Sequence, residues 1–328
     1  MHLLMYLIIF PVISFVFFLK IISVKYLIYF YLLLLLEHLL QEFNRLLITL
    51  SKPIMANVVM FFRSGAWVYA VLLLFIKSDD FLNLDTIFIG WIIGNFFGLI
   101  VAIYQLRDFE WKQIFKIRVK WALIKNGLII SLPFFIGNIA LKCIELFDRY
   151  IIQYNFGEKL VGVYTFYGSI TNVVLILIDT GIIVMLQPKL ITYFQKKEFK
   201  SYNKIMRKMK KSIYFSIVPI IIIGMVGFPV FLNFIKINPL YSDYLPAYWI
   251  RLIAMALYVI SYIPHYELYV RKLDHFILIS SITSMILSLV LNLILIPKFD
   301  LLGASLSFLI AYTSLLLMKY YFYKISNK

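Results

Sequence analysis

Residues 140–150 read ALKCIELFDRY and place four charged side chains, Lys142, Glu145, Asp148 and Arg149, inside a long hydrophobic stretch. The chain of 328 residues is 63% hydrophobic and only 15% charged. A soluble protein is usually about half apolar and a quarter charged. Apolar runs of about 20 residues therefore predict membrane-spanning helices. Charges inside such a helix must face protein or water, because each one costs roughly 2.5–3.5 kcal/mol against lipid at the bilayer centre.

Hydropathy windows of about 19 residues predict ten spanning helices, which makes the chain an all-α integral membrane protein. The breaks between these helices contain turn-forming residues such as Asn155-Phe156-Gly157 and Ile296-Pro297. The predicted spans cover 3–19, 26–44, 53–76, 83–105, 126–154, 160–188, 212–235, 245–270, 275–296 and 301–323.

The basic residues predict the orientation of these spans. Loops on one side, together with both termini, contain 22 of the 32 Lys and Arg residues, and loops on the other side contain six. Cytoplasmic loops carry the excess of basic residues, so both termini are expected in the cytoplasm. The formal charge of +16 is then mainly a topology signal, and we do not expect nucleic-acid binding.

The run KKEFKSYNKIMRKMKK at 196–211 is the most basic part of the chain. Its pattern predicts an amphipathic helix in a cytoplasmic loop, lying against the anionic headgroups of membrane lipids. A specific regulatory partner is the alternative.

Polar residues of the predicted span 126–154 gather on one side of the helix. At 100° per residue they share an arc of about 80°, and Asp148 falls just outside it. The simpler interpretation is a set of structural pairs, Lys142–Glu145 and Glu145–Arg149, at spacings of three and four. The alternative is a surface that lines a hydrated cavity and includes such pairs. The residues in the arc are Ser131, Asn138, Lys142, Glu145, Arg149 and Gln153.

Other predicted spans repeat this pattern. Single polar residues often only join helices, but stripes on four or five helices predict a shared, hydrated central cavity containing charges of both signs. The stripes consist of Thr165, Gly168, Asn172 and Asp179; of Arg251, Tyr258, Tyr262, His265 and Tyr269; and of Glu37, Gln41 and Asn44, while Arg63 lies between small residues.

The sequence favours transport over catalysis. The lone Cys143 excludes an internal disulfide, and the four histidines lack metal-ligand spacing. There is no phosphate-binding glycine-rich loop, and the predicted external loops are too short to hold a catalytic domain. We therefore predict no enzyme activity, no cofactor and no metal. A channel would show repeated motifs and a filter loop, and neither is visible.

Several segments resemble the bacterial polysaccharide flippases, which include O-antigen transporters. This family belongs to the multidrug/oligosaccharidyl-lipid/polysaccharide exporter superfamily, which also holds the multidrug and toxin extrusion transporters. The resemblance is best over 126–328. It rests on Leu132-Pro133, Glu145, Asp148-Arg149, Gly157, Val161-Gly162-Val163-Tyr164, Gln187-Pro188, LYVRK (268–272) and LNLILIPKFDLLGASLSFLIAY (291–312).

The resemblance implies two bundles of six helices that open alternately to the two sides of the membrane. Residues 126–328 would form a complete C-terminal six-helix bundle, and 1–125 a partial N-terminal bundle of four helices. The chain is thus expected to lack the family's first two spans, to insert in the membrane and to transport poorly. Asp300 is a smaller departure, since it stands where this family usually has glycine.

The resemblance also implies a function and a location. The substrate would be an undecaprenyl-pyrophosphate-linked oligosaccharide, flipped across the bacterial inner membrane for O-antigen, capsule or similar polysaccharide synthesis. The expected partners are membrane lipids, a coupling ion (proton or sodium) and the polymerase machinery. The alternatives are a drug or metabolite exporter of the same superfamily, and a membrane-embedded glycosyltransferase or polymerase of the same pathway.

Two groups of residues are the site candidates that follow. Those expected to bind substrate are Arg63, Asn138, Lys142, Arg149, Gln153, Asn172, Arg251, Tyr258 and Tyr262. Those expected to couple an ion, or to neutralise nearby basic groups, are Glu37, Glu145, Asp148 and Asp179.

Overall fold

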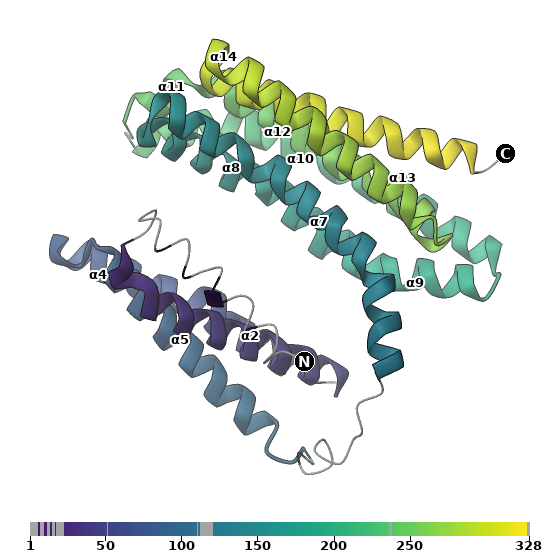
Figure 1. The fold of residues 1–328 in the computed structure, drawn as a ribbon, viewed down its shortest axis with the longest axis horizontal. Helices are drawn as coiled ribbons and strands as arrows, with labels where there is room; N and C mark the ends of the chain where they lie inside the picture. The colour runs from purple at the N-terminus through teal and green to yellow at the C-terminus, as the bar shows by residue number, and fades with distance from the viewer. Residues whose placement is uncertain are drawn as a thin grey trace. The chain divides into compact units, whose positions relative to one another are not determined.

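A computed structural model describes residues 23–50, 52–109, 121–235 and 238–326, with the isolated positions 6, 10, 11, 14, 17 and 111. These residues are almost entirely helical, and no strand occurs among them. The chain divides into two compact units, Met1–Val119 and Lys120–Lys328, which are coloured from purple to blue and from teal to yellow in Figure 1.

The first unit is built around three apolar helical segments. Its second segment is one continuous span, Ile54–Lys77, interrupted by a π-helix rather than by a turn. The last segment begins where the side chain of Asn83 accepts a hydrogen bond from the Thr86 amide at 2.9 Å, as an N-cap residue does. The elements are η1 (Val24–Tyr26), α2 (Leu27–Thr49), α3 (Pro53–Phe61), η2 (Phe62–Ala66), α4 (Trp67–Lys77), η3 (Asp79–Phe81) and α5 (Leu84–Gln105).

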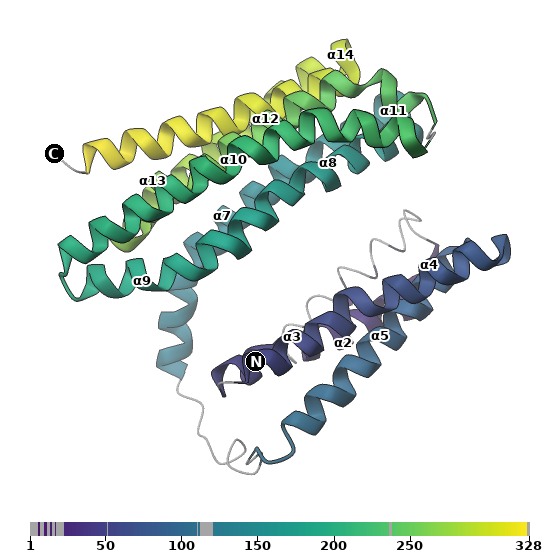
Figure 2. The ribbon, with the colours of Figure 1, turned by 180° about the vertical axis from the view of Figure 1, so that it is seen from behind.

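The second unit is a bundle of long helices that lie side by side (Figures 1 and 2). Its core contains interlocking aromatic rings, including Tyr167, Phe228 and Tyr248, whose centroids lie 4.1–5.9 Å apart. The elements are α7 (Trp121–Phe156), α8 (Glu158–Ile178), the π-helix η4 (Asp179–Ile183), α9 (Val184–Gln195), α10 (Phe199–Ile235), α11 (Leu240–Asp243), α12 (Leu245–Ile260), α13 (Tyr262–Val270) and α14 (Asp274–Ile325).

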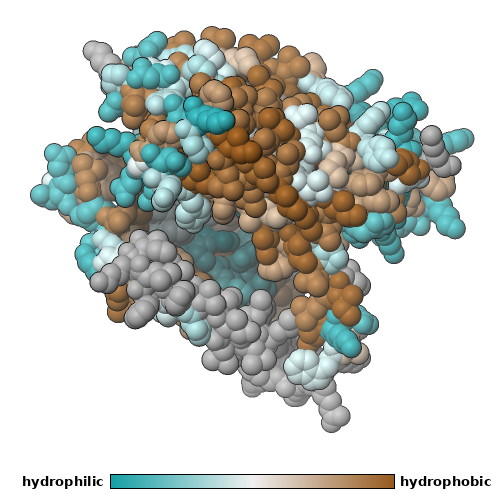
Figure 3. All heavy atoms as spheres, turned by 45° about the horizontal axis from the view of Figure 1, so that its top comes forward, coloured by the Kyte–Doolittle hydropathy of each residue, from teal (hydrophilic) through white to brown (hydrophobic). Residues whose placement is uncertain are grey.

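Eight helical segments of the described residues are long and apolar enough to cross a membrane. They correspond to the second to tenth predicted spans, because the last two predicted spans are merged in α14. The first predicted span, 3–19, lies largely outside the described residues. Large hydrophobic side chains on the outer faces, such as Ile286, Val290 and Leu293, are exposed as lipid contacts require. On the face seen in Figure 3, hydrophobic side chains gather in the middle and hydrophilic ones toward the two sides.

Four predicted boundaries were wrong by five residues or more, for the same reason. The helix predicted from 126 begins at Trp121, and the helix predicted from 212 begins at Phe199. The helix predicted to end at 44 continues to Thr49, and the helix predicted to end at 188 continues to Gln195. Hydropathy marks the part of a helix inside the hydrocarbon, but a helix can continue into water when one face stays packed.

The turn within α14 brings its two arms together (Figure 1). Asp300 has φ 47° and ψ −126°, and the Leu302 amide donates to its Oδ1 at 3.3 Å. Past this turn the arms touch at Gly303, where a Cβ would lie 2.1 Å from the carbonyl oxygen of Leu295. The turn therefore requires glycine at 303 and favours glycine at 300.

We predict that Asp300→Gly stabilises the protein. A non-glycine residue at such a φ costs about 1–3 kcal/mol, and the lost Asp300–Leu302 hydrogen bond offsets part of the gain. The expected result is a higher thermal midpoint in detergent, followed by tryptophan fluorescence. Gly303→Ala is the opposing control and should lower the midpoint. An unchanged or lower midpoint for Asp300→Gly would show that Asp300 is not strained.

Candidate functional site

The second unit contains a fully buried ion pair between α12 and α7. Arg251 Nη1 donates to Asp148 Oδ2 at 3.4 Å, and the two side chains are 0% and 1% exposed. The guanidinium also lies over the rings of Tyr164 and Phe308, 4.5 and 4.1 Å from their centroids. Cations over aromatic faces are stabilised electrostatically. One charge thus joins four helices, α7, α8, α12 and α14.

A glycine makes room for this arginine. At Gly168 on α8, an added Cβ would lie 3.1 Å from Arg251 Nη2 and 3.4 Å from its Cζ. The sequence placed Gly168 in a polar stripe without suggesting this role. The arrangement shows why a small residue is needed there: the guanidinium packs directly against the α8 backbone.

A second polar network lies one turn away on α7. Lys142 Nζ donates to Glu145 Oε2 at 2.6 Å, and Asn172 Nδ2 on α8 donates to Glu145 Oε1 at 3.0 Å. The Glu145 side chain is 18% exposed, whereas that of Lys142 is 68% exposed within the unit. Lys142 lies 14 residues before the end of α7, or roughly 21 Å along its axis. That depth places an exposed ammonium well inside a hydrocarbon layer about 30 Å thick.

The polar arc predicted for the span 126–154, which is part of α7, is only partly confirmed. The Lys142–Glu145 pair is present, but no Glu145–Arg149 pair exists among the described residues; the buried Arg149 Nε has no partner there. Asp148, which fell outside the predicted arc, forms the buried pair instead. The angular position of a residue around its helix does not show which neighbouring helix supplies the opposite charge. The other members of the stripe, Ser131, Asn138 and Gln153, are exposed.

The tyrosines of the eighth predicted span belong to an aromatic cluster. Tyr258 stacks on Tyr312 of α14 at 4.5 Å, and Tyr262 lies 5.5 Å from Tyr258. The row continues through His265 to Tyr269, whose rings stack at 6.3 Å. Tyr312 is buried and the other four rings are half-buried, so the cluster contributes to packing while Tyr258 and Tyr262 stay partly accessible.

The first unit has its own charged network. Glu37 on α2 accepts from Arg63 Nε at 2.5 Å, from Trp91 Nε1 at 2.9 Å and from Asn95 Nδ2 at 3.2 Å. The ring of Trp91 also stacks on Trp67 at 5.6 Å. Sequence reasoning treated Glu37 and Arg63 as separate candidates and missed both α5 residues. An asparagine after glycine in the middle of the apolar run 84–105 was a signal that could have found Asn95.

Both units place a charged candidate in a π-helix. Arg63 lies in η2, and Asp179 begins η4 inside the long span Glu158–Gln195. Short π-helical segments within α-helices occur frequently at functional sites. Within the described residues, no group of three or more His, Cys, Asp or Glu side chains is arranged to hold a metal ion.

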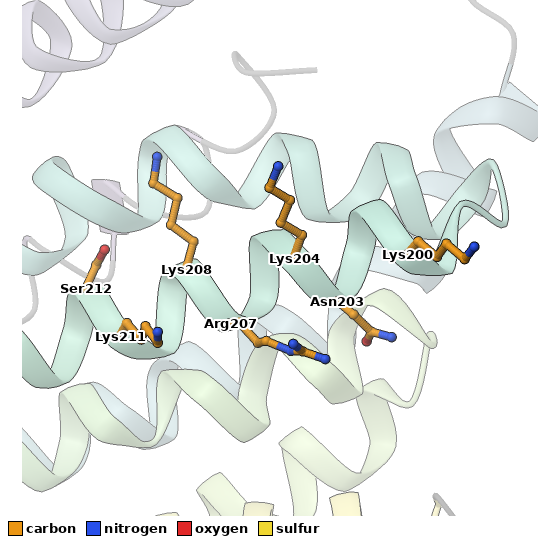
Figure 4. Close-up of a pocket in the computed structure, with 7 residues that line it drawn as sticks. All are labelled: Lys200, Asn203, Lys204, Arg207, Lys208, Lys211 and Ser212. Carbon is orange, nitrogen blue, oxygen red and sulfur yellow. The ribbon is translucent and has the colours of Figure 1, made fainter.

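The basic run predicted as a separate loop helix is the start of α10. Because α10 has 37 residues, it is roughly 55 Å long and exceeds the hydrocarbon thickness. With α9 it forms a helical hairpin (Figure 2), closed by Lys197 at φ 60°. The expected amphipathic pattern is present, since Tyr202, Met206 and Met209 are buried. The opposite face contains Lys200, Asn203, Lys204, Arg207, Lys208, Lys211 and Ser212 (Figure 4).

Three solved structures share this fold. An outward-facing multidrug resistance MATE family transporter of the MOP superfamily matches with a TM-score of 0.65, 12% identity, and coverage of 87% of this chain. A MATE protein in a bent conformation matches with a TM-score of 0.71, 14% identity and coverage of 98% of this chain. A MATE protein in complex with MaL6 matches with a TM-score of 0.64, 11% identity and coverage of 87% of this chain. This chain spans 65%, 73% and 65% of those chains, respectively.

No family model matches the sequence, and no curated protein matches it either. At these identities the likeness shows the fold. Together with the apolar segments, it establishes a multi-pass, all-α membrane protein with the architecture of MATE transporters.

We predict that Asp148→Leu destabilises the second unit. It leaves Arg251 as an uncompensated buried cation, which typically costs about 3–5 kcal/mol. The thermal midpoint in detergent should fall sharply, and the double variant Asp148→Leu/Arg251→Met should recover most of the loss. Gln153→Leu on the exposed side of α7 is the control and should change little. Equal midpoints for Asp148→Leu and Gln153→Leu would contradict the buried pair.

Proposed function

We propose that this chain flips undecaprenyl-pyrophosphate-linked oligosaccharide repeat units across the bacterial cytoplasmic membrane by alternating access, for surface polysaccharide synthesis. The likeness to MATE transporters supports the transport fold, and the sequence resemblance to polysaccharide flippases supports the substrate class. The observation that carries the proposal is the exposed, membrane-embedded Lys142 beside Glu145.

The physical obstacle to flipping is the polar head of the substrate. Sugar hydroxyls and phosphates lose their hydrogen-bonding partners in hydrocarbon, at several kcal/mol for each unsatisfied group. A protein that carries such a head must offer replacement partners at bilayer depth while the polyprenyl tail stays in lipid. Lys142 fits this requirement, because its ammonium is exposed although its helix is hydrophobic.

The other substrate-contact candidates divide by accessibility. Arg149 is half-buried, and its Nε is buried without a partner among the described residues, so only the rest of its guanidinium is proposed to pair with phosphate. Asn138, Gln153 and the half-buried Asn172 offer amides to sugar hydroxyls. Tyr258 and Tyr262 offer ring faces to sugars, and Arg63 contributes the equivalent charge in the first unit.

Arg251 needs a different role from the direct substrate contact expected of it. Its guanidinium is enclosed by Asp148, Tyr164 and Phe308, and its side chain is 0% exposed. We assign it to holding α7, α8, α12 and α14 in register, so that the neighbouring Lys142–Glu145 network keeps its orientation. Asp148 shares this positioning role.

Carboxylates within the spans are the candidates for coupling to a proton or sodium ion. Glu145 already pairs with Lys142, and Glu37 with Arg63, so a substrate phosphate that attracts the cation would release the carboxylate. Asp179 in η4 is the third candidate. This exchange would link substrate binding to ion binding through charges of opposite sign.

The distribution of basic residues supports cytoplasmic termini. The α9–α10 hairpin would then project into the cytoplasm, where its basic face can contact anionic membrane lipids. The polysaccharide polymerase machinery would receive the flipped product on the opposite side.

A second candidate function is export of drugs or metabolites. It is favoured by the structural likeness to a multidrug resistance transporter. The two functions differ in the charge they require: a cationic drug needs acidic groups that are accessible, whereas Glu37 and Glu145 are each engaged by a basic side chain.

Mass spectrometry of lipid-linked glycans in a deletion strain separates these functions. The flippase function predicts that lipid-linked repeat units accumulate and surface polysaccharide falls. Unchanged glycans combined with increased sensitivity to cationic compounds would favour the exporter and contradict the flippase.

We predict that Lys142→Ala abolishes or reduces surface polysaccharide by at least tenfold in the same strain. Loss of one charge-assisted contact of about 1.5–3 kcal/mol corresponds to roughly a 10- to 150-fold change. Lys159→Ala is the matched control, since Lys159 is an exposed lysine at the start of α8. Immunoblots must show equal membrane levels. Polysaccharide at the wild-type level in Lys142→Ala would remove Lys142 from the site.

A further inference from the structure

The second unit contains a cavity in whose lining only Asn138 has been given a role above. Its volume is about 210 Å³, and it lies among α7, α9, α13 and both arms of α14. Its apolar lining comes mainly from Pro133, Phe134, Leu141, Ile277 and Leu278. The polar side chains that line it are Asn138, Gln187, His265, Tyr266, Tyr269, Asp274, Ser281 and Lys319.

Lys319 is the unusual member of this lining. It is 1% exposed, and no hydrogen-bond or ion-pair partner for it occurs among the described residues. Burying an unpaired ammonium is costly, and an anion bound beside it would offset that cost.

His265 contributes a second polar group to the same part of the cavity. Its Nδ1 is buried without a partner in the described part of the chain, and its ring is near enough to Lys319 for electrostatic interaction. Tyr266 is already engaged, donating to Gln187 Oε1 at 3.4 Å. Lys319 and His265 thus remain as two converging groups whose polar atoms need a ligand.

Asp274 lies at the other end of the cavity. Its Oδ1 is buried and without a hydrogen-bond donor among the described residues, while Lys272 and His275 lie on its own turn. Phe276 stacks on Phe322 at 4.4 Å, which sets the antiparallel arms of α14 in register. Lys319 is then roughly 8 Å deeper along the helix than Asp274, and it donates no hydrogen bond to Asp274 Oδ1.

We propose that this cavity binds a small phosphate-type oxyanion carrying a hydroxyl or other hydrogen-bond donor. Its charged oxygens would contact Lys319 and His265, and its donor would point toward Asp274. Lysine is a common phosphate ligand that acts as a compact point charge. The oxyanion is either a free ion or the phosphate of a lipid headgroup. The inference concerns binding and does not rest on the proposed flippase function.

If Lys319 binds a ligand, removing it affects the stability of the ligand-free protein in the opposite way from removing a structural residue. A structural cation would destabilise the unit when removed, as for either member of the Arg251–Asp148 pair. A buried cation whose partner is a ligand lowers the stability of the protein when the ligand is absent. Lys319→Met, which keeps the length and apolar character of the side chain, should therefore leave the thermal midpoint unchanged or raise it.

The test uses the full chain purified in detergent, with the thermal midpoint measured by tryptophan fluorescence. Sodium phosphate is compared with sodium chloride at equal ionic strength, and undecaprenyl phosphate is added separately to the micelles. Wild type should gain a few degrees with at least one phosphate, because a ligand that binds only the folded state stabilises it. A gain with inorganic phosphate supports a free ion, and a gain only with the lipid supports a headgroup.

Single-residue variants show whether the phosphate-dependent rise in thermal midpoint comes from binding in this cavity. Lys189→Met removes an exposed lysine of α9 and should keep the phosphate-dependent gain, whereas Lys319→Met should lose it. His265→Phe provides a second variant and should weaken the gain. The inference is overturned if neither phosphate shifts the wild type, if Lys319→Met keeps the full shift, or if Lys319→Met itself lowers the midpoint strongly.

Discussion

The Arg251–Asp148 pair is the interaction on which the second unit most depends. In a bilayer, apolar helices gain little by leaving lipid for one another, so specific contacts must set their packing. A fully buried pair whose cation also touches two aromatic rings and a glycine provides contacts to four helices at one point. Removing one member of such a pair leaves an uncompensated buried charge, so helix packings that separate Arg251 from Asp148 are strongly disfavoured.

The polar groups around this point divide into three kinds with different consequences. Arg251 and Asp148 form an ion pair with each other and are inaccessible. Lys142 and Glu145 also pair, yet leave the ammonium exposed at bilayer depth. Lys319 is buried but has no partner among the described residues. The first kind stabilises the bundle, whereas the other two are retained at an energetic cost, as groups that contact ligands are.

Much of this architecture follows from the sequence. Apolar runs and turn residues predicted the all-α membrane fold, and spacing predicted the Lys142–Glu145 pair. The sequence could not show which helix faces which, so the buried partner of Arg251, the Trp91 and Asn95 donors to Glu37, and the burial of Lys319 were missed. Hydropathy also cannot mark the end of a helix in water, and α10 therefore begins at Phe199 rather than at 212. The glycine usual at position 300 was a correct signal of an unusual backbone conformation.

Reconstitution tests the central claim, that the chain moves a pyrophosphate-linked oligosaccharide across a bilayer, most directly. Labelled undecaprenyl-pyrophosphate oligosaccharide is placed in sealed liposomes, and the fraction accessible to an impermeant glycosidase is measured with and without the protein. Our account predicts that nearly all of the lipid becomes accessible when the protein is present, against about half in protein-free liposomes. Equal accessible fractions in both preparations, with the protein shown to be folded, would contradict it.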